Sequence, residues 1–289
     1  MESGQNSPPL VTVAIASYNH KAYIADSLNS VLQQTYKNVE FIVIDDGSTD
    51  GSIPIIQALA KKHGFAFESQ HNMGLPGTLN KALAKCRGRY FVPFGSDDVM
   101  LNDRLEKQVA YMEANPHIAI CGGNILKIDK YGKDLDKQKN NPADQLEFQD
   151  IFLDKKPGLP APTLFFRKKI LDEVGGFDQH ILLEDLYIQL AIAKKGYKLG
   201  YLKDTLAKYR VHSSNSYKNL KFMHDSVMET YSKFSDDPSY EAVKNKFLNS
   251  LFIKAANRDK QYGFELLKKI PLKSYNLKTA RGILRLIGP

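Results

Sequence analysis

The sequence has few cysteines and no long apolar run. Of its 289 residues only Cys86 and Cys121 are cysteines, and their spacing fits no disulfide framework, zinc site or redox motif, which indicates a reducing compartment. No apolar stretch approaches the about 20 residues that a membrane-spanning helix needs. The polar start MESGQNSPPL also lacks the charged-then-apolar order of a signal peptide. We therefore expect a cytoplasmic protein.

Most of the chain also lacks excess charge. Residues 1–240 hold 29 basic and 29 acidic side chains, whereas residues 241–289 hold 11 Lys or Arg against 3 Asp or Glu. In this tail Leu, Ile and Phe interleave with Lys and Arg, which is typical of a helix lying on an anionic bilayer. A solvated packing helix gives the same pattern. We predict a peripheral contact of residues 241–289 with the inner face of the cell membrane, and no binding of nucleic acid.

The first hundred residues alternate between strand and helix patterns. β-branched apolar runs indicate strands that are covered on both faces, and apolar residues recur at helical spacing between them. The predicted segments are, in order, a strand at 11–17, a helix around 24–32, a strand at 39–45, a helix at 52–64, a strand at 65–69, a helix at 78–86 and a strand at 90–94. This alternation predicts an α/β fold with a Rossmann-like, doubly wound and mostly parallel sheet.

The later residues predict a mixed element and then helices. IAICGG at 118–123 and ILKID at 125–129 read as two short strands, and the pattern is helical from about Tyr217 onward. We predict one domain over residues 1–215 and a basic helical C-terminal extension over residues 216–289.

Two predicted strands end on carboxylates. YFVPF leads to Asp97 and Asp98, and FIVID ends in Asp45 and Asp46. In an open α/β sheet the carboxyl ends of parallel strands form the edge where ligands bind. A fixed pair of carboxylates is a candidate site for a hard divalent cation, whereas a capped turn is the structural alternative.

Several motifs stand in one order along the chain. They are VTVAIASYNHKAYIADSLNSVLQQTYKNVEFIVIDDGSTDGS, NMGLPGTLNKALAKCRGRYFVPFGSDDVMLNDRLEKQV, GGFD at 175–178, the pair Glu184-Asp185, and YRVH at 209–212. Over about residues 10–215 they resemble the inverting family 2 glycosyltransferases of GT-A fold. The resemblance implies a nucleotide-binding half at about 1–100 and an acceptor half at about 101–215.

The resemblance also implies an activity. A metal-dependent enzyme of this family would transfer a hexosyl or N-acetylhexosaminyl group from a UDP- or dTDP-sugar. The acceptor would be a saccharide or a lipid-linked glycan in the biosynthesis of cell-surface polysaccharide or lipopolysaccharide.

The resemblance assigns roles to acids and to one histidine. Asp98 would be the direct ligand of manganese or magnesium, His212 would help to hold the metal or the pyrophosphate, and Asp97 would contact ribose or sugar. The family pattern is often Asp-x-Asp and its first position is Ser96 here, so the split between the two acids stays open. Asp185, or alternatively Glu184, would be the general base, and favourable charge at a helix N-terminus is the structural alternative.

The other predicted donor contacts lie in the strand-end loops. Tyr18 would stack on a pyrimidine, and Asp46 would accept the ring N–H that uracil and thymine offer and adenine does not. Asp45 would instead cap the turn, and Arg210 reads as either a phosphate partner or a surface residue. The predicted nucleotide-sugar contacts are Ala16, Ser17, Tyr18, Asn19, Asp45, Asp46, Asn72, Gly74, Asn80, Ser96 and Asp97.

Two other functions compete with this one. A sugar nucleotidyltransferase shares the parallel sheet, but the sequence lacks a Gly-rich loop after the first strand followed by a Lys that would grip a triphosphate. A non-catalytic binder of sugar or nucleic acid could use the basic tail. It would not need Asp97, Asp98 and Asp185 together.

Overall fold

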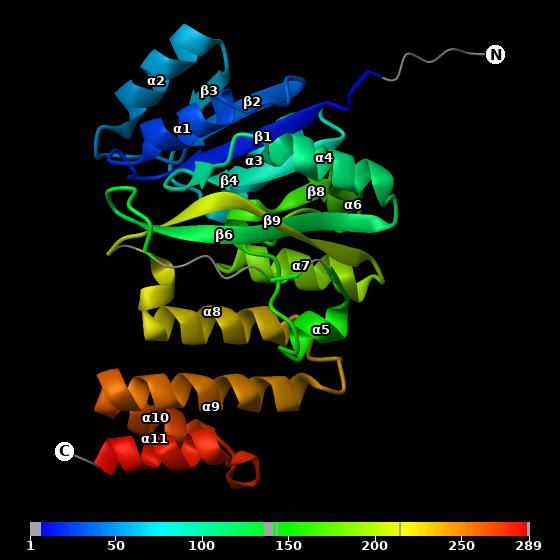
Figure 1. Cartoon of the computed structure of the whole chain (residues 1–289). Helices are drawn as coiled ribbons and strands as arrows, with labels where there is room; N and C mark the ends of the chain where they lie inside the picture. Colours follow the sequence, from blue (N-terminus) through cyan, green and yellow to red (C-terminus); the bar gives the residue numbers. More distant parts are fainter. Residues whose placement is uncertain (1–6, 136–140, 143, 214, 288–289) are drawn as a thin grey trace. The chain divides into compact units, whose positions relative to one another are not determined.

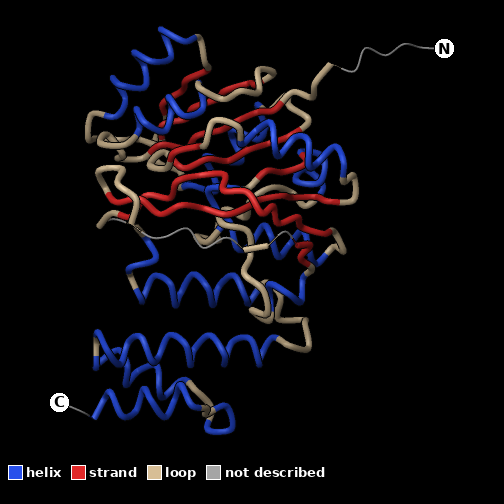
Figure 2. The backbone as a smooth tube through the Cα atoms, viewed as in Figure 1, coloured by secondary structure: helices blue, strands red, loops and turns tan. Residues whose placement is uncertain are grey.

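The computed structural model describes residues 7–135, 141–142, 144–213 and 215–287. The chain divides into two compact units. The first unit comprises Met1–Ile151 and Lys156–His212, and the second comprises Phe152–Lys155 and Ser213–Pro289. The first unit is built on a sheet and the second on helices (Figures 1 and 2). Our sequence-based boundary after residue 215 differs from this division, which falls after His212 and assigns residues 152–155 to the second unit.

A mixed sheet forms the centre of the first unit. In the described residues its strands are β1 (Val11–Ser17), β2 (Val39–Asp45), β3 (Ala66–Ser69), β4 (Tyr90–Gly95), β5 (Val99–Met100), β6 (Ile118–Asp129), β7 (Asp144–Leu146), β8 (Phe165–Arg167) and β9 (Lys198–Val211). Their spatial order is β3-β2-β1-β4-β8-β6-β9-β5, with β7 on β9. The long pairings are parallel, and the short strands β5, β7 and β8 pair antiparallel. The predicted α/β class with a mostly parallel sheet is confirmed.

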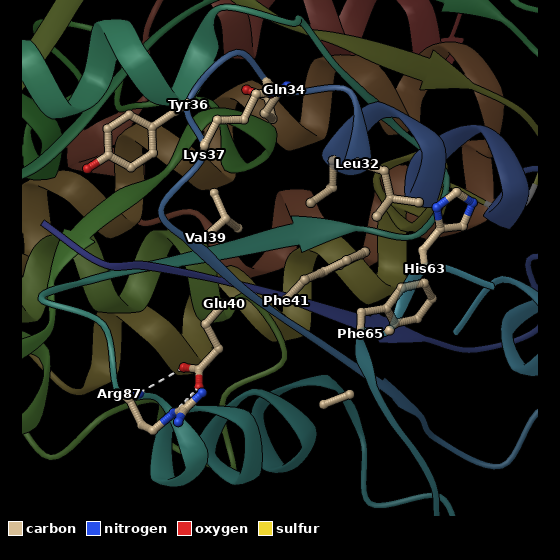
Figure 3. Close-up of a pocket in the computed structure, with 13 residues that line it drawn as sticks. Leu32, Gln34, Tyr36, Lys37, Val39, Glu40, Phe41, His63, Phe65 and Arg87 are labelled. Atoms are coloured by element: carbon tan, nitrogen blue, oxygen red, sulfur yellow. Dashed lines mark hydrogen bonds and ion pairs between the residues drawn. The ribbon is translucent and has the colours of Figure 1, made fainter. Parts of the chain in front are cut away.

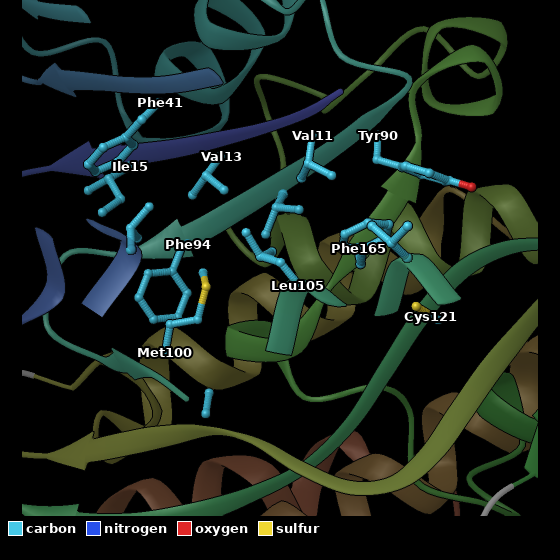
Figure 4. Packing of buried hydrophobic residues seen from close by; sticks show 14 of the residues in the cluster. Val11, Val13, Ile15, Phe41, Tyr90, Phe94, Met100, Leu105, Cys121 and Phe165 are labelled. Atoms are coloured by element: carbon cyan, nitrogen blue, oxygen red, sulfur yellow. The ribbon is translucent and has the colours of Figure 1, made fainter. Parts of the chain in front are cut away.

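Helices cover both faces of the parallel half of this sheet. They are α1 (Ile24–Leu32), α2 (Ser52–His63), α3 (Leu75–Lys85) and α4 (Arg104–Ala114). Val11, Val13 and Ile15 of β1 share one apolar cluster with Leu105 of α4 (Figure 4). Leu28 of α1 belongs to the same cluster. The helix α3 contacts β1 without joining this cluster and covers the opposite face. This two-sided cover explains why the strands read as continuous apolar runs.

Beyond α4 come short helices and one longer helix. They are α5 (Phe148–Phe152), α6 (Lys168–Glu173) and α7 (Glu184–Lys194). The helix α7 begins at the Glu184-Asp185 pair.

Two sequence-based boundaries are wrong. The two short strands predicted at 118–123 and 125–129 form the single strand β6. Gly123 lies there because a Cβ would come within 2.8 Å of the Asp204 carbonyl oxygen of β9, so it marks a close backbone approach rather than a break. The helix predicted from Thr78 begins at Leu75, since Pro76 needs no N–H partner in a first turn.

The second unit is helical, as predicted. Its helices are α8 (Leu220–Ser232), α9 (Tyr240–Arg258), α10 (Lys260–Lys269) and α11 (Leu277–Ile287). Leu251 and Phe252 of α9 pack with Leu266 of α10 and Leu286 of α11. The Phe252 ring lies so close to Gly282 of α11 that a Cβ at this position would overlap it. Within the described part of the chain, no helix combines the length and the apolar character needed to cross a membrane.

Candidate functional site

The loops after β1, β2 and β4 meet at one edge of the sheet. The strand β1 lies between β2 and β4 and runs parallel to both, so Ser17 is level with Asp45 and Ala16 is level with Gly95. Chain connections leave β1 in both directions, which makes this edge the switch point where open α/β sheets bind ligands. The predicted residues at 17–19, 45–46 and 96–98 therefore come from three adjacent loops.

Asp97 lies in a group with two histidines. Its Oδ2 is 2.8 Å from Nε2 of the buried His212. One ligand atom from each of His20, Asp97 and His212 lies within 4.8 Å of the others. Sequence reasoning missed His20, although it directly follows the predicted donor loop 17–19. Burial, which outweighs the nearby Asp97 charge, lowers the pKa of His20.

Asp98 has a different environment from its neighbour. Its buried Oδ1 accepts a hydrogen bond from the Arg210 backbone N–H at 2.9 Å. Burial, and then the Asp97 charge, raise the pKa of Asp98 well above its ordinary value. Burial also acts to raise the pKa of Asp97, but the hydrogen bond from His212 and the nearby imidazoles hold it below its ordinary value. The geometry thus groups Asp97, and not Asp98, with the predicted ligand His212.

Gly95 allows both acids to fold back over the end of β4. A Cβ at this position would lie 3.0 Å from Asp97 Oδ1 and 3.0 Å from Asp98 Oδ2. A side chain would therefore push the carboxylates away from the edge of the sheet.

The buried Arg210 side chain links Asp97 to the helix α1. Its Nε donates to the Asp97 carbonyl oxygen at 2.8 Å, and its Nη2 lies 3.0 Å from Asp26 Oδ2. Its guanidinium also stacks 4.9 Å from the centre of the Tyr23 ring. Because the side chain is 2% exposed, the alternative that Arg210 is a surface residue is wrong, and its role as a phosphate partner stays a prediction.

The acids after β2 hold the neighbouring loops. Asp45 accepts hydrogen bonds from the backbone N–H and the hydroxyl of Ser48, at 2.8 and 2.7 Å, and so caps the turn. Asp46 accepts from Gln70 Nε2, Met73 N and Gly74 N at 2.8, 2.8 and 2.9 Å. A carboxylate has about four acceptor positions, so these three hydrogen bonds leave one position of Asp46 unused.

The loop after β1 presents an aromatic ring beside a fixed backbone. Tyr18 is 49% exposed, as a stacking role requires. Asn19 has a left-handed φ of 52°, and its Oδ1 accepts from Thr49 N at 2.9 Å. Ala16 is half-buried, and Ser17 is fully buried with its Oγ unpartnered at the strand end.

The predicted sugar-side residues separate into two kinds. Asn72 is exposed and its Oδ1 accepts from Gly74 N at 3.2 Å, so both belong to the loop that Asp46 holds. Asn80 instead bonds the backbone of Phe177 twice, through Nδ2 to the carbonyl at 2.6 Å and through Oδ1 from the N–H at 2.9 Å. Both the oxygen and the nitrogen of its amide are hydrogen bonded to this backbone, and its contact with the sugar stays a prediction.

Glu184 and Asp185 open α7 and are partly buried. Burial, and then the Asp185 charge, raise the pKa of Glu184 to about 8, and burial raises the pKa of Asp185. Asp185 Oδ1 also accepts from the Leu186 N–H at 2.8 Å. The Asn80–Phe177 clamp ties the segment that precedes α7 to α3, which begins at the Gly74 loop.

A separate cavity of about 400 Å³ does not belong to this site (Figure 3). It is lined by residues that include Tyr36, Glu40, Phe41, Phe65 and Arg87. Glu40 and Phe41 stand near the start of β2, and Phe65 precedes β3. The cavity therefore lies toward the amino ends of the strands, away from the carboxyl edge that holds Asp46 and Asp97.

Known proteins share this chain's sequence and fold. The model of glycosyl transferase family 2 matches residues 12–175, more than half of the chain. A Bacillus subtilis glycosyltransferase, TuaG, whose assignment to teichuronic acid biosynthesis is provisional, is 32% identical over 223 residues, which are 75% of this chain and 86% of TuaG.

Solved structures show the same fold at low identity. S. aureus TarS 1–349 in complex with UDP-GlcNAc has a TM-score of 0.65 and 18% identity, over 96% of this chain and 81% of TarS 1–349. This chain also matches 50% of a longer TarS chain. The mannosyltransferase PcManGT of Pyrobaculum calidifontis, in complex with GDP-Man and Mn²⁺, has a TM-score of 0.65 and 20% identity, over 98% and 86% of the two chains.

Proposed function

Because the chain belongs to glycosyl transferase family 2, we propose that it is an inverting enzyme that transfers a sugar from a UDP- or dTDP-sugar. The acceptor is a saccharide or lipid-linked glycan of cell-surface polysaccharide or lipopolysaccharide biosynthesis, in line with the relative TuaG. The observation that carries the proposal is the meeting of Tyr18, Asp46 and Asp97 at the switch point of the sheet. Neither a nucleotidyltransferase nor a non-catalytic binder is supported by the family.

The donor lies along the carboxyl edge. Tyr18 stacks on the base, the fourth acceptor position of Asp46 takes the ring N–H, and the Gly74 loop approaches the diphosphate and sugar. TarS is described with UDP-GlcNAc and PcManGT with GDP-Man. Uracil and guanine each have a ring N–H that can donate a hydrogen bond to a carboxylate. Adenine offers no such donor, so ADP-sugars are the donors that this site should reject.

The divalent ion, Mn²⁺ or Mg²⁺, is held by Asp97 and His212. An ionised carboxylate beside a buried imidazole is a donor set that fits such an ion, and PcManGT is described with Mn²⁺. When bound, the ion neutralises negative charge on the diphosphate leaving group. Asp97 replaces our sequence-based choice of Asp98, because one Asp98 oxygen is already bonded to the Arg210 backbone.

Asp185 is the general base of a single displacement. The acceptor oxygen bonds to the anomeric carbon, the bond from that carbon to the diphosphate oxygen breaks, and the acceptor proton passes to Asp185. Glu184, with a pKa of about 8, carries a proton at neutral pH and cannot take a second one. Asp185 is therefore the residue that we assign as the base.

Helix α11 contacts an anionic membrane. Leu277, Leu284 and Ile287 are 79%, 66% and 72% exposed and share one face, since they follow each other at helical spacing. Lys278, Arg281 and Arg285 are exposed on the same helix, which has no acidic residue. Leu286 packs inside the second unit, so the outward apolar face is additional to the packing face and suits a bilayer surface.

The test of the activity is a donor screen. Purified protein is incubated with UDP-glucose, UDP-GlcNAc, a dTDP-sugar, GDP-mannose and ADP-glucose, each with Mn²⁺, with Mg²⁺ or with EDTA, and released nucleoside diphosphate is measured. We expect release from a uridine or thymidine donor that depends on metal. Equal release with EDTA would contradict the metal assignment, and no release from any donor would contradict the activity.

A further inference from the structure

The loop after β1 reaches the group around Asp97 through His20. The His20 carbonyl accepts from the N–H groups of Tyr23 and Ile24 at 2.9 and 2.8 Å, which fixes it at the start of α1. The flanking residues are tied to the loop after β2, Asn19 to Thr49 and Lys21 to Asp50. The backbone of His20 is therefore held from both sides.

The His20 ring is also held by its own hydrogen bond. Its Nδ1 lies 2.7 Å from Oγ of Ser96, which is buried and directly precedes Asp97. When Nδ1 donates this bond, Nε2 keeps its lone pair. Histidines that bind metals in proteins show this arrangement, with one nitrogen on the ion and the other on a fixed acceptor.

The His20 ring lies close enough to Asp97 and His212 to bind the same ion. The rings of His20 and His212 meet edge to face with centres 5.6 Å apart, and their ligand atoms lie with that of Asp97 within 4.8 Å of one another. Donors about 2.1 Å from one ion lie about 3 to 4.2 Å apart. Small side-chain movements therefore suffice to place all three on one ion.

We propose that His20 is a third protein ligand of the divalent ion, beside Asp97 and His212, and that this donor set makes the site prefer Mn²⁺ to Mg²⁺. The inference rests on the metal-dependent function proposed above, in which only Asp97 and His212 hold the ion. It adds His20 to these two ligands. Mg²⁺ binds chiefly oxygen, whereas imidazole suits the later transition metals, and Mn²⁺ lies between these classes. A site with two imidazoles and one carboxylate therefore disfavours Mg²⁺ most.

A consequence is that one loop binds both the ion and the base. Tyr18 and His20 are two residues apart on a loop that is held through the Asn19 side chain to Thr49 and through the Lys21 backbone to Asp50. Metal binding through His20 thus fixes the loop that presents the Tyr18 ring.

The test measures metal affinity directly. Mn²⁺ binding in the presence of saturating UDP is followed by the electron paramagnetic resonance signal of free Mn²⁺, and Mg²⁺ affinity is obtained by competition. For His20→Ala we expect Mn²⁺ affinity to fall at least about 10-fold, because losing a direct ligand should cost no less than the about 10-fold lower limit for losing a partner of a ligand, and Mg²⁺ affinity to change by less than about threefold. The matched control is His63→Ala, an exposed histidine at the end of α2, which should bind both ions as the native protein does.

A second variant and a Co²⁺ spectrum distinguish the loss of a metal ligand from misfolding of the His20→Ala protein. Ser96→Ala keeps His20 but removes its hydrogen-bond partner, so Mn²⁺ affinity should fall by a smaller factor than in His20→Ala. The visible absorption of the Co²⁺-loaded protein should change in His20→Ala and not in His63→Ala. Native Mn²⁺ affinity in both His20→Ala and Ser96→Ala would overturn the inference alone, whereas a native protein that binds no metal with UDP would overturn the proposed metal dependence as well.

Discussion

The carboxyl edge of the sheet and the second unit use polar and apolar side chains in opposite ways. At the edge, Asp46, Asp98 and Arg210 are buried and hydrogen bonded. In the second unit the charges of α11 are exposed, and so are Leu284 and Ile287. Buried polar groups need hydrogen-bond partners, which hold them in a fixed geometry. Exposed apolar side chains that share one surface often mark a site that binds a protein or a membrane. Chemistry is therefore expected at the edge and docking at the tail.

The largest effect is expected at Asp97. Asp97→Asn should lose transfer and the metal-dependent part of UDP binding, because the ion loses its charged ligand. Asp98→Asn should keep UDP binding close to native, since the amide has the shape of the carboxyl group and its oxygen still accepts from the Arg210 N–H. Calorimetry of UDP binding with and without EDTA distinguishes them, and the opposite result would restore Asp98 as the ligand.

The next effect separates the acids of α7. Asp185→Asn should keep donor binding and lose on the order of 10²- to 10⁴-fold in turnover, the usual contribution of a positioned base. Glu184→Gln should retain most of the turnover, because Glu184 with its pKa of about 8 is already neutral at pH 7. Turnover and UDP affinity are measured for both variants at pH 7. An inactive Glu184→Gln beside an active Asp185→Asn would reverse the two roles.

A packing test asks whether the edge depends on the second unit. Gly282→Val forces a side chain against Phe252 and should destabilise the second unit by about 1–3 kcal/mol, the usual cost of overpacking. Ala280→Val, at an exposed position of the same helix, is the control for helix propensity. Thermal unfolding measures stability and calorimetry measures UDP affinity, which should stay native in both variants. Weaker UDP binding in Gly282→Val alone would show that the two regions are coupled.

The smallest effect is expected on membrane binding. Leu284→Ser with Ile287→Ser should weaken binding to anionic liposomes several-fold without disturbing the core residue Leu286, and binding should fall further with salt, which screens surface charge within about 8 Å at physiological ionic strength. Leu135→Ser, an exposed leucine of the first unit, is the matched control.

Flotation of the native protein, these variants and a deletion of Asn276–Pro289 gives the comparison. Activity on a short soluble acceptor should survive, because every residue assigned to chemistry precedes residue 215. If the α11 variants float as the native protein does, or if the native protein does not float, the membrane contact is wrong.

Local patterns in the sequence determined the first half of the fold. β-branched runs specify β1 and β2, an aromatic-rich apolar run specifies β4, and the apolar spacing of α1 reflects one buried face. Each of these patterns spans only a few neighbouring residues, so it can be recognised in the sequence without a structure. The strand-end acids could be predicted for the same reason, because parallel strands bring their carboxyl ends to one edge.

The hydrogen-bond partner of each buried polar side chain depends on how distant segments pack. His20 and Asp97 join His212, and Arg210 braces Asp97, across more than 100 residues of chain. Asn80 clamps Phe177 from 97 residues away. A polar residue carries no local mark of its partner, because the hydrogen bond that it makes when buried depends on strand register and loop approach. The sequence therefore determined where acids would gather, and the packing of distant segments determined which of them can hold a metal.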